Sequence, residues 1–208
     1  MYELVAADAF RSKNGGRYNM SERVTLPPPS DGEASANESG LPRRLVFNCI
    51  VPAEAPSLAY SKTDGSCYQM VLYFTATAER LQSWVDGGCA ASRLFSRWVA
   101  DGGVDKELKE RLKLLVKMEN LRELGTSFAM LERYNGKPAL ITKSGAIYRG
   151  PDYIEVCMNT FRFAFMTKKG VHSLMHRIPE FDLHAAIVRS RHADACPCAT
   201  RHIPARRP

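Results

Sequence analysis

The chain has 208 residues, 45% of them hydrophobic, which is enough for one sizeable core and favours a single domain. Its apolar runs are far shorter than the roughly 20 residues of a membrane-spanning helix, and its first residues include acidic side chains where a secretion signal would be basic and then apolar. The 29 basic and 22 acidic residues give a net charge of +7, much of it after residue 161, which suits lipid head groups, nucleic acid or an acidic protein as a partner.

The first part of the chain is polar and lacks apolar periodicity. Residues 12–44 are dominated by Gly, Ser, Asn, Pro and charged side chains, which bury too little apolar surface to offset the entropy lost on ordering. We therefore predict that residues 1–44 form a flexible segment or linker and that an ordered domain covers residues 45–190. Residues 191–208 are basic and rich in proline, which predicts a tail.

Strand patterns mark the start of the predicted domain. Residues 45–51 carry β-branched and aromatic side chains, and residues 67–74 have two largely apolar faces, which predicts a central strand. Two helices are expected next. Thr77 is placed to cap the first, and each helix is followed by a Gly-Gly pair that would end it.

The second half of the chain alternates between extended and helical patterns. Residues 105–124 fit a helix or a strand by periodicity. Residues 128–134 and 139–142 fit two strands joined by Asn135-Gly136, because Asn-Gly accepts the positive φ angles of a hairpin turn. Further strands are predicted at residues 153–158 and 181–187, with an amphipathic helix over residues 161–178 between them.

The six cysteines, at positions 49, 67, 89, 157, 196 and 198, are scattered through a chain with ample apolar content. Disulfide frameworks are typical of small secreted domains without a core, so we expect free thiols in a cytoplasmic protein. The tail brings together His192, Cys196, Cys198 and His202, which are ligand types that Zn²⁺ prefers. Because Cys-x-Cys is tight for two ligands of one tetrahedral ion, we expect no metal and no other cofactor. A zinc-dependent or thiol enzyme is kept as an alternative.

Other chemical motifs are weak. No glycine-rich loop of the phosphate-binding types is present, so nucleotide chemistry has no support. Glu155 lies in an apolar strand and would need a partner if it were buried, and Arg149 is the nearest attractive candidate for a structural salt bridge. The basic tail lacks interleaved aromatic residues that could stack on bases, so nucleic acid is an unfavoured partner. A protein- or nucleic-acid-binding module is the second alternative.

One motif is more specific. Pro138 and Leu140 of a predicted short strand precede the run Tyr148-Arg-Gly-Pro-Asp-Tyr-Ile-Glu155. The motif positions are Pro138, Leu140, Tyr148, Arg149, Gly150, Pro151, Tyr153 and Glu155. This pattern resembles the C-terminal domain of the plant enhanced disease resistance proteins, a family of poorly defined function, and similar segments extend the resemblance over residues 45–190. The resemblance also implies an extended conformation for residues 112–118.

In the plant relatives this domain follows membrane-binding and START-type lipid-transfer modules, which implies lipid recognition without catalysis and, as partners, other domains of a longer protein. We expect an α+β fold in which an antiparallel sheet packs against the C-terminal amphipathic helix and two short mid-chain helices. The predicted function is non-enzymatic binding of lipid or an anionic membrane surface by a cytoplasmic, peripheral domain. The predicted contacts are Phe161, Phe165, Lys168, Lys169, Leu174, Met175 and Arg177. The alternative is that the aromatic members of this set belong to the core.

Overall fold

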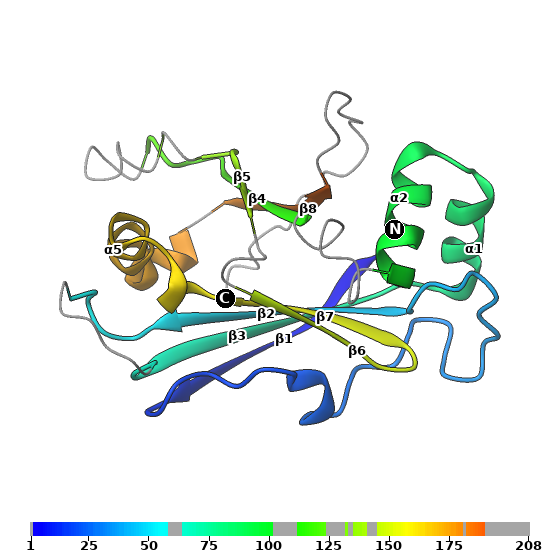
Figure 1. The fold of residues 1–208 in the computed structure, drawn as a ribbon, viewed down its shortest axis with the longest axis horizontal. Coiled ribbons are helices and arrows are strands. Elements are labelled where there is room, and N and C mark those ends of the chain that lie inside the picture. Colours follow the sequence, from blue (N-terminus) through cyan, green and yellow to red (C-terminus); the bar gives the residue numbers. More distant parts are fainter. Residues whose placement is uncertain are drawn as a thin grey trace.

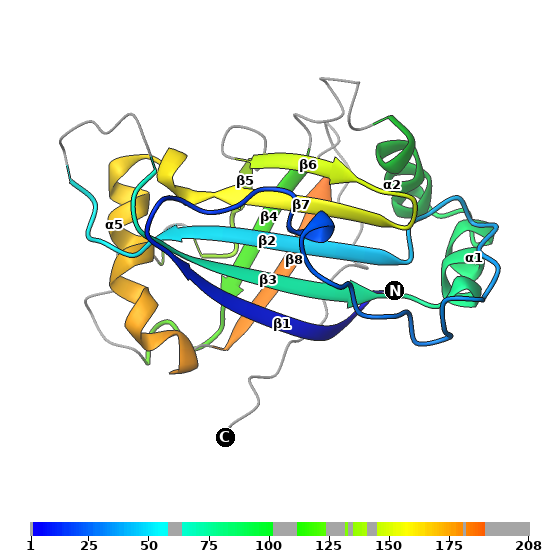
Figure 2. The same ribbon diagram turned by 90° about the horizontal axis from the view of Figure 1, so that it is seen from below.

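The computed structural model describes residues 2–57, 64–101, 112–123, 132, 135–140, 145–180 and 182–189. They form an α+β fold with a five-stranded and a three-stranded sheet, here sheet A and sheet B (Figure 1). Sheet B, α2 and α5 lie on one side of sheet A, and the chain that follows β1 runs across the other side (Figures 1 and 2). The predicted fold class is confirmed.

Sheet A has the strand order β1-β3-β2-β7-β6. Its strands are β1 (Glu3–Ser12), β2 (Arg44–Pro52), β3 (Cys67–Thr75), β6 (Gly145–Arg149) and β7 (Tyr153–Asn159). The pair β2 and β7 is parallel and the other pairs are antiparallel, so the sheet is mixed where the sequence predicted an antiparallel one. The predicted central strand, β3, does lie between two neighbours.

Sheet B contains β4 (Leu112–Met118), β5 (Pro138–Leu140) and β8 (Leu183–Arg189) in the antiparallel order β5-β4-β8. The extended conformation expected for residues 112–118 is therefore present. Asn135 fastens the end of β4, because its side chain accepts from the Met118 N–H at 2.7 Å and donates to the Met118 carbonyl at 2.8 Å. Gly136 has a φ of 68°, a positive angle as expected at the turn, but β5 pairs with β4. Of the strand predicted at residues 128–134 the structure describes only Glu132, which is helical.

The two predicted mid-chain helices are α1 (Ala78–Asp86) and α2 (Ala90–Asp101). Thr77 caps α1, since its side chain accepts from the Arg80 N–H at 3.2 Å. The predicted C-terminal helix is divided into η3 (Thr160–Arg162), α5 (Phe165–Leu174) and η4 (Met175–Glu180). The division follows from Phe163 and Ala164, whose ψ angles of 157° and 148° are extended and interrupt the helical hydrogen bonds.

Sheet A has two faces with different covers. We call the face that carries Leu45, Phe47, Ile154 and Val156 the helix face, because α2 packs there through Trp98. The other face carries Val46, Ile50, Val71, Tyr73 and Glu155 and is covered by residues 13–43, which we call the strap, so we call it the strap face. Paired residues of neighbouring strands share a face, which lets the register assign every side chain of the sheet.

Sheet A also has two distinct ends. The strands β1, β2 and β7 run in one direction, opposite to β3 and β6, so β1, β2 and β7 end where β3 begins. Helix α5 follows β7 there, and we call this the α5 end. Helices α1 and α2 lie at the opposite end, where β3 ends (Figures 1 and 2).

The prediction of a flexible segment over residues 1–44 is wrong for the described residues 2–44. Residues 3–12 are β1, paired with β3 along its length, and the strap supplies buried side chains such as Met20 and Leu41 to the core. Composition misled the prediction, because the strap is ordered mainly by polar contacts with the sheet and needs few apolar residues. Strand β6 was also not predicted. Residues 191–208 lie outside the described residues.

Candidate functional site at the α5 end

Six of the eight family-motif positions lie on the β6–β7 hairpin, at the end of sheet A opposite the α5 end. Arg149 donates to the carbonyls of Trp98 and Ala100 at 2.6 and 3.1 Å, so it satisfies carbonyl groups in the last turn of α2 and ties that helix to the sheet. The predicted Arg149–Glu155 salt bridge is therefore wrong. The reason is the register, which pairs Arg149 with Ile154 on the helix face and leaves Glu155 on the strap face.

Glu155 is 0% exposed and fastens the strap to the sheet. Its carboxylate accepts from the N–H groups of Met20 and Ser21 at 3.1 and 2.8 Å, from the Ser21 hydroxyl at 2.8 Å and from Asn48 Nδ2 at 2.9 Å. No ion pair involves Glu155 among the described residues. Hydrogen-bond donors thus take the place of a cation, which gives Glu155 a structural role.

Asp152, which lies within the same run of residues, also holds the strap. The Asp152 carboxylate accepts from Arg43 Nε at 3.0 Å and from Arg44 Nη1 at 2.8 Å, and these two guanidinium groups in turn bond carbonyl groups of the strap. Gly150 is required by close approach, because a Cβ atom there would lie 2.0 Å from the Tyr153 ring. The motif residues of this hairpin therefore mainly join the β6–β7 hairpin to the strap and to α2.

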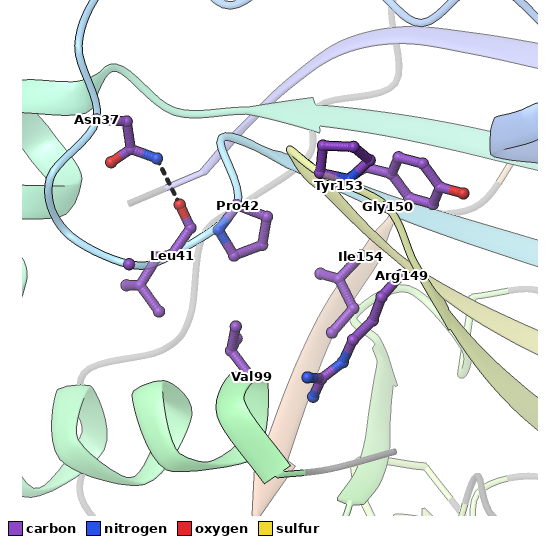
Figure 3. A pocket seen from close by; sticks show the side chains of 10 residues that line it. Asn37, Leu41, Pro42, Val99, Arg149, Gly150, Tyr153 and Ile154 are labelled. Carbon is purple, nitrogen blue, oxygen red and sulfur yellow. Dashed lines mark hydrogen bonds between the residues drawn. The ribbon is translucent and has the colours of Figure 1, made fainter.

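A pocket of about 270 Å³ lies beside this hairpin (Figure 3). Leu41, Pro42, Val99 and Ile154 provide its apolar lining, and Arg149 lies at its edge. The Arg149 guanidinium already bonds α2, and Asn37 on the far side donates to the Leu41 carbonyl at 2.6 Å. These polar groups are engaged within the protein, so we do not place the functional site here.

The remaining motif positions are distributed over both sheets. Pro138 and Leu140 are the first and last residues of β5 in sheet B, away from the hairpin in the sequence and in the sheet order. Tyr148 is half-buried on the strap face, where it packs near Tyr18 and Phe161. The structure therefore does not bring all the motif residues into one site.

Cationic and apolar side chains gather at the α5 end instead. Met166 of α5 is 48% exposed, and Lys169 of the same helix is exposed while Lys168 is half-buried. At the same end, the exposed Arg11 is the next-to-last residue of β1, and the exposed Lys13 follows the strand. None of these cations forms an ion pair with any part of the chain that the structure describes. We take this surface as the candidate functional site.

The residues predicted to contact lipid are placed differently from one another. Phe161 packs against Ile50, Cys67 and Cys157, so its ring belongs to the core of the strap face. Arg177 forms an ion pair with Glu180 at 2.6 Å, which balances its charge. Phe165 and Met175 are half-buried, and the side chain of Leu174 lies outside the described ones. Met166 and Arg11 were missed, because neither an isolated Met nor a residue of an unpredicted strand stands out in the sequence.

The described cysteines at positions 49, 67, 89 and 157 are all free. Burial raises the pKa of Cys49 to about 12 and also raises the pKa of Cys157, so both remain protonated thiols at neutral pH. Hydrogen bonds from Ser92 lower the pKa of the exposed Cys89. A cysteine nucleophile also needs a neighbouring base, and the residues that shift the pKa of Cys89 are Ser92, Ala91 and Arg93, none of which can act as one at neutral pH.

The described part of the chain contains neither a metal site nor a membrane-spanning helix. The described residues contain no group of three His, Cys, Asp or Glu side chains that could hold a metal ion. The zinc candidates His192, Cys196, Cys198 and His202 lie outside the described residues. No described helix is long and apolar enough to cross a bilayer.

Comparison with known proteins gives one match. A family model described as "Protein ENHANCED DISEASE RESISTANCE 2, C-terminal" matches residues 1–197, which is nearly the whole chain. No curated protein and no solved structure matches the chain. The match begins well before residue 45, in agreement with the inclusion of β1 and the strap in the fold.

Proposed function

This chain belongs to the family of the C-terminal domain of Protein ENHANCED DISEASE RESISTANCE 2, and we propose that it is a non-enzymatic domain that binds an anionic membrane surface through its α5 end. The observation that carries this proposal is the combination on α5 of the exposed Met166 with Lys168 and Lys169, which have no ion pair among the described residues. An apolar side chain beside uncompensated cations is the arrangement that favours the boundary between head groups and acyl chains.

The charges decide the strength of such binding. A basic residue close to an anionic leaflet contributes about 1 kcal/mol, so Lys168, Lys169, Arg11 and Lys13 together would contribute about 4 kcal/mol if all four reached the head groups. Insertion of Met166 would add about 1 kcal/mol, because half of its side chain is already removed from water. The sum corresponds to reversible, peripheral binding that weakens at high salt.

The predicted contacts enter the proposal with unequal weight. Lys168 and Lys169 carry it, Met166 is added to them, and the half-buried Phe165 and Met175 would support α5 against the body of the domain. Arg177 contributes less because Glu180 neutralises it. Other domains of a longer protein would then be partners that share the same membrane.

The test is flotation with vesicles of phosphatidylcholine, with and without phosphatidylserine. The double variant K168E/K169E should lose binding to the anionic vesicles by about thirtyfold or more, because at least two contributions of about 1 kcal/mol disappear. The matched control is R93E/R97E on α2, which changes the net charge equally at the opposite end of sheet A and should bind as the unchanged protein does. Equal binding to neutral and anionic vesicles, or equal loss in both double variants, would refute the proposal.

A further inference from the structure

The helix face of β3 is accessible although β3 is an inner strand. Its side chains there are Tyr68, Met70, Leu72 and Phe74, which we call the β3 row. Tyr68 and Met70 are 43% and 42% exposed, and Leu72 and Phe74 are half-buried, whereas Val71 on the strap face is 0% exposed. Large apolar side chains in the middle of a sheet are normally covered, so an accessible row of them indicates a surface that binds something apolar.

The neighbours of the β3 row shape it. On the β1 side, Ala9 pairs with Met70 and Ala7 with Leu72, so small side chains border the middle of the row there. On the β2 side, Phe47 pairs with Leu72 and stands half-buried beside it. The middle of the row is therefore bordered by the bulky Phe47 side chain on one side and by alanine side chains on the other.

A cation stands at the open end of the row. Arg11 pairs with Tyr68 across β1 and β3, and its guanidinium lies 5.7 Å from the centre of the Tyr68 ring. This is the α5 end, so Lys168 and Lys169 of the candidate site lie at the same end of the sheet (Figures 1 and 2). Along the row, the side chains therefore change from an exposed Tyr68 beside the cation of Arg11 to a half-buried Phe74.

We propose that the β3 row binds one acyl chain of a single anionic lipid, with the lipid head group at Arg11. Six residue steps from Tyr68 to Phe74 span about 20 Å, which exceeds the roughly 15 Å that one acyl chain occupies in half of a bilayer core. The inference rests on the proposed function, because docking of the α5 end on a membrane would present the open end of the row to the lipids.

The test uses cis-parinaric acid, an 18-carbon polyene fatty acid whose fluorescence rises in an apolar environment, as a soluble probe with an acyl chain and an anionic group. Titration of the whole protein should show saturable binding of one probe per chain. Met70→Glu, which puts a charge in the row, and Ala9→Trp, which fills its open side without a charge, should each weaken this binding by about tenfold. The control Phe10→Glu alters an apolar side chain of similar exposure, 39%, on the strap face and should change the affinity by less than about twofold.

Flotation of the same proteins separates this inference from the proposed function. Met70→Glu should still float with vesicles that contain phosphatidylserine, because Lys168, Lys169 and Met166 are unchanged. A protein that floats with these vesicles but takes up no parinaric acid overturns the β3 row as a lipid site and leaves the membrane surface intact. Saturable uptake that neither Met70→Glu nor Ala9→Trp weakens overturns it as well. Uptake without flotation supports the row and overturns the proposed surface.

Discussion

Glu155 is the residue whose removal should most clearly separate the strap from the sheet. In Glu155→Ala, the backbone N–H groups of Met20 and Ser21 lose their acceptor inside a contact that is buried on both sides. An unsatisfied buried donor costs about 1–3 kcal/mol, so the two together should lower the free energy of unfolding by about 4 kcal/mol. Asn48 loses less, because its Nδ2 group also donates to the Arg17 carbonyl at 3.0 Å.

The assay is urea denaturation, with Glu155→Gln and Glu38→Ala measured beside Glu155→Ala. Glu155→Gln keeps the side-chain volume, but it replaces one acceptor oxygen with an NH2 group that cannot accept from the strap N–H groups. This variant should therefore lower the free energy of unfolding by about 2 kcal/mol. Glu38 is an exposed strap residue, and its replacement should change stability by less than about 0.5 kcal/mol. Limited trypsin digestion should also cut the strap at Arg23 sooner in Glu155→Ala. If Glu155→Ala is as stable as Glu38→Ala, the carboxylate does not hold the strap and our account of the motif is wrong.

Two further predictions concern the hairpin and the thiols. Gly150→Ala should destabilise the protein by about 1–3 kcal/mol in thermal or urea unfolding, because the new Cβ atom would overlap the Tyr153 ring. Gly65→Ala is the control and should be tolerated, because no atom lies within 4 Å of its Cβ position. Equal stability of the two variants would contradict the close packing at Gly150. Alkylation by iodoacetamide at pH 8, followed by peptide mass spectrometry, should modify the exposed Cys89 well before Cys49. The lowered pKa of Cys89 favours the reactive thiolate, whereas the raised pKa of Cys49 preserves the thiol. Equal rates of alkylation would show that the burial of Cys49 is transient.

Local pattern predicted most of the regular elements. The alternation in residues 67–74 identified β3, and Thr77 identified the start of α1, because side-chain periodicity and capping act within a few residues. Strand β1 was missed for the opposite reason. Its residues are nearly all exposed along an edge, so they show no apolar alternation, and only pairing with β3, 55 to 72 residues later, makes them a strand.

The candidate site was predictable only in part. Lys168 and Lys169 were among the predicted contacts within the helical pattern of residues 161–178, and both lie on α5. The role of Phe161 was not predictable, because helical spacing identifies an apolar side chain without showing whether it faces the core or the solvent. Arg149 was assigned the wrong partner, since proximity in sequence does not reveal the face of a strand.

The sequence by itself determined the family, the fold class and most of the regular elements, because these depend on short-range periodicity and on one specific run of residues from Tyr148 to Glu155. Only the tertiary structure decided that the polar strap covers one face of sheet A and that the row of β3 on the other face stays accessible. The physical reason is that covering a face depends on register and direction among distant strands, and β1, β3 and β7 acquire a common register only when the chain is folded.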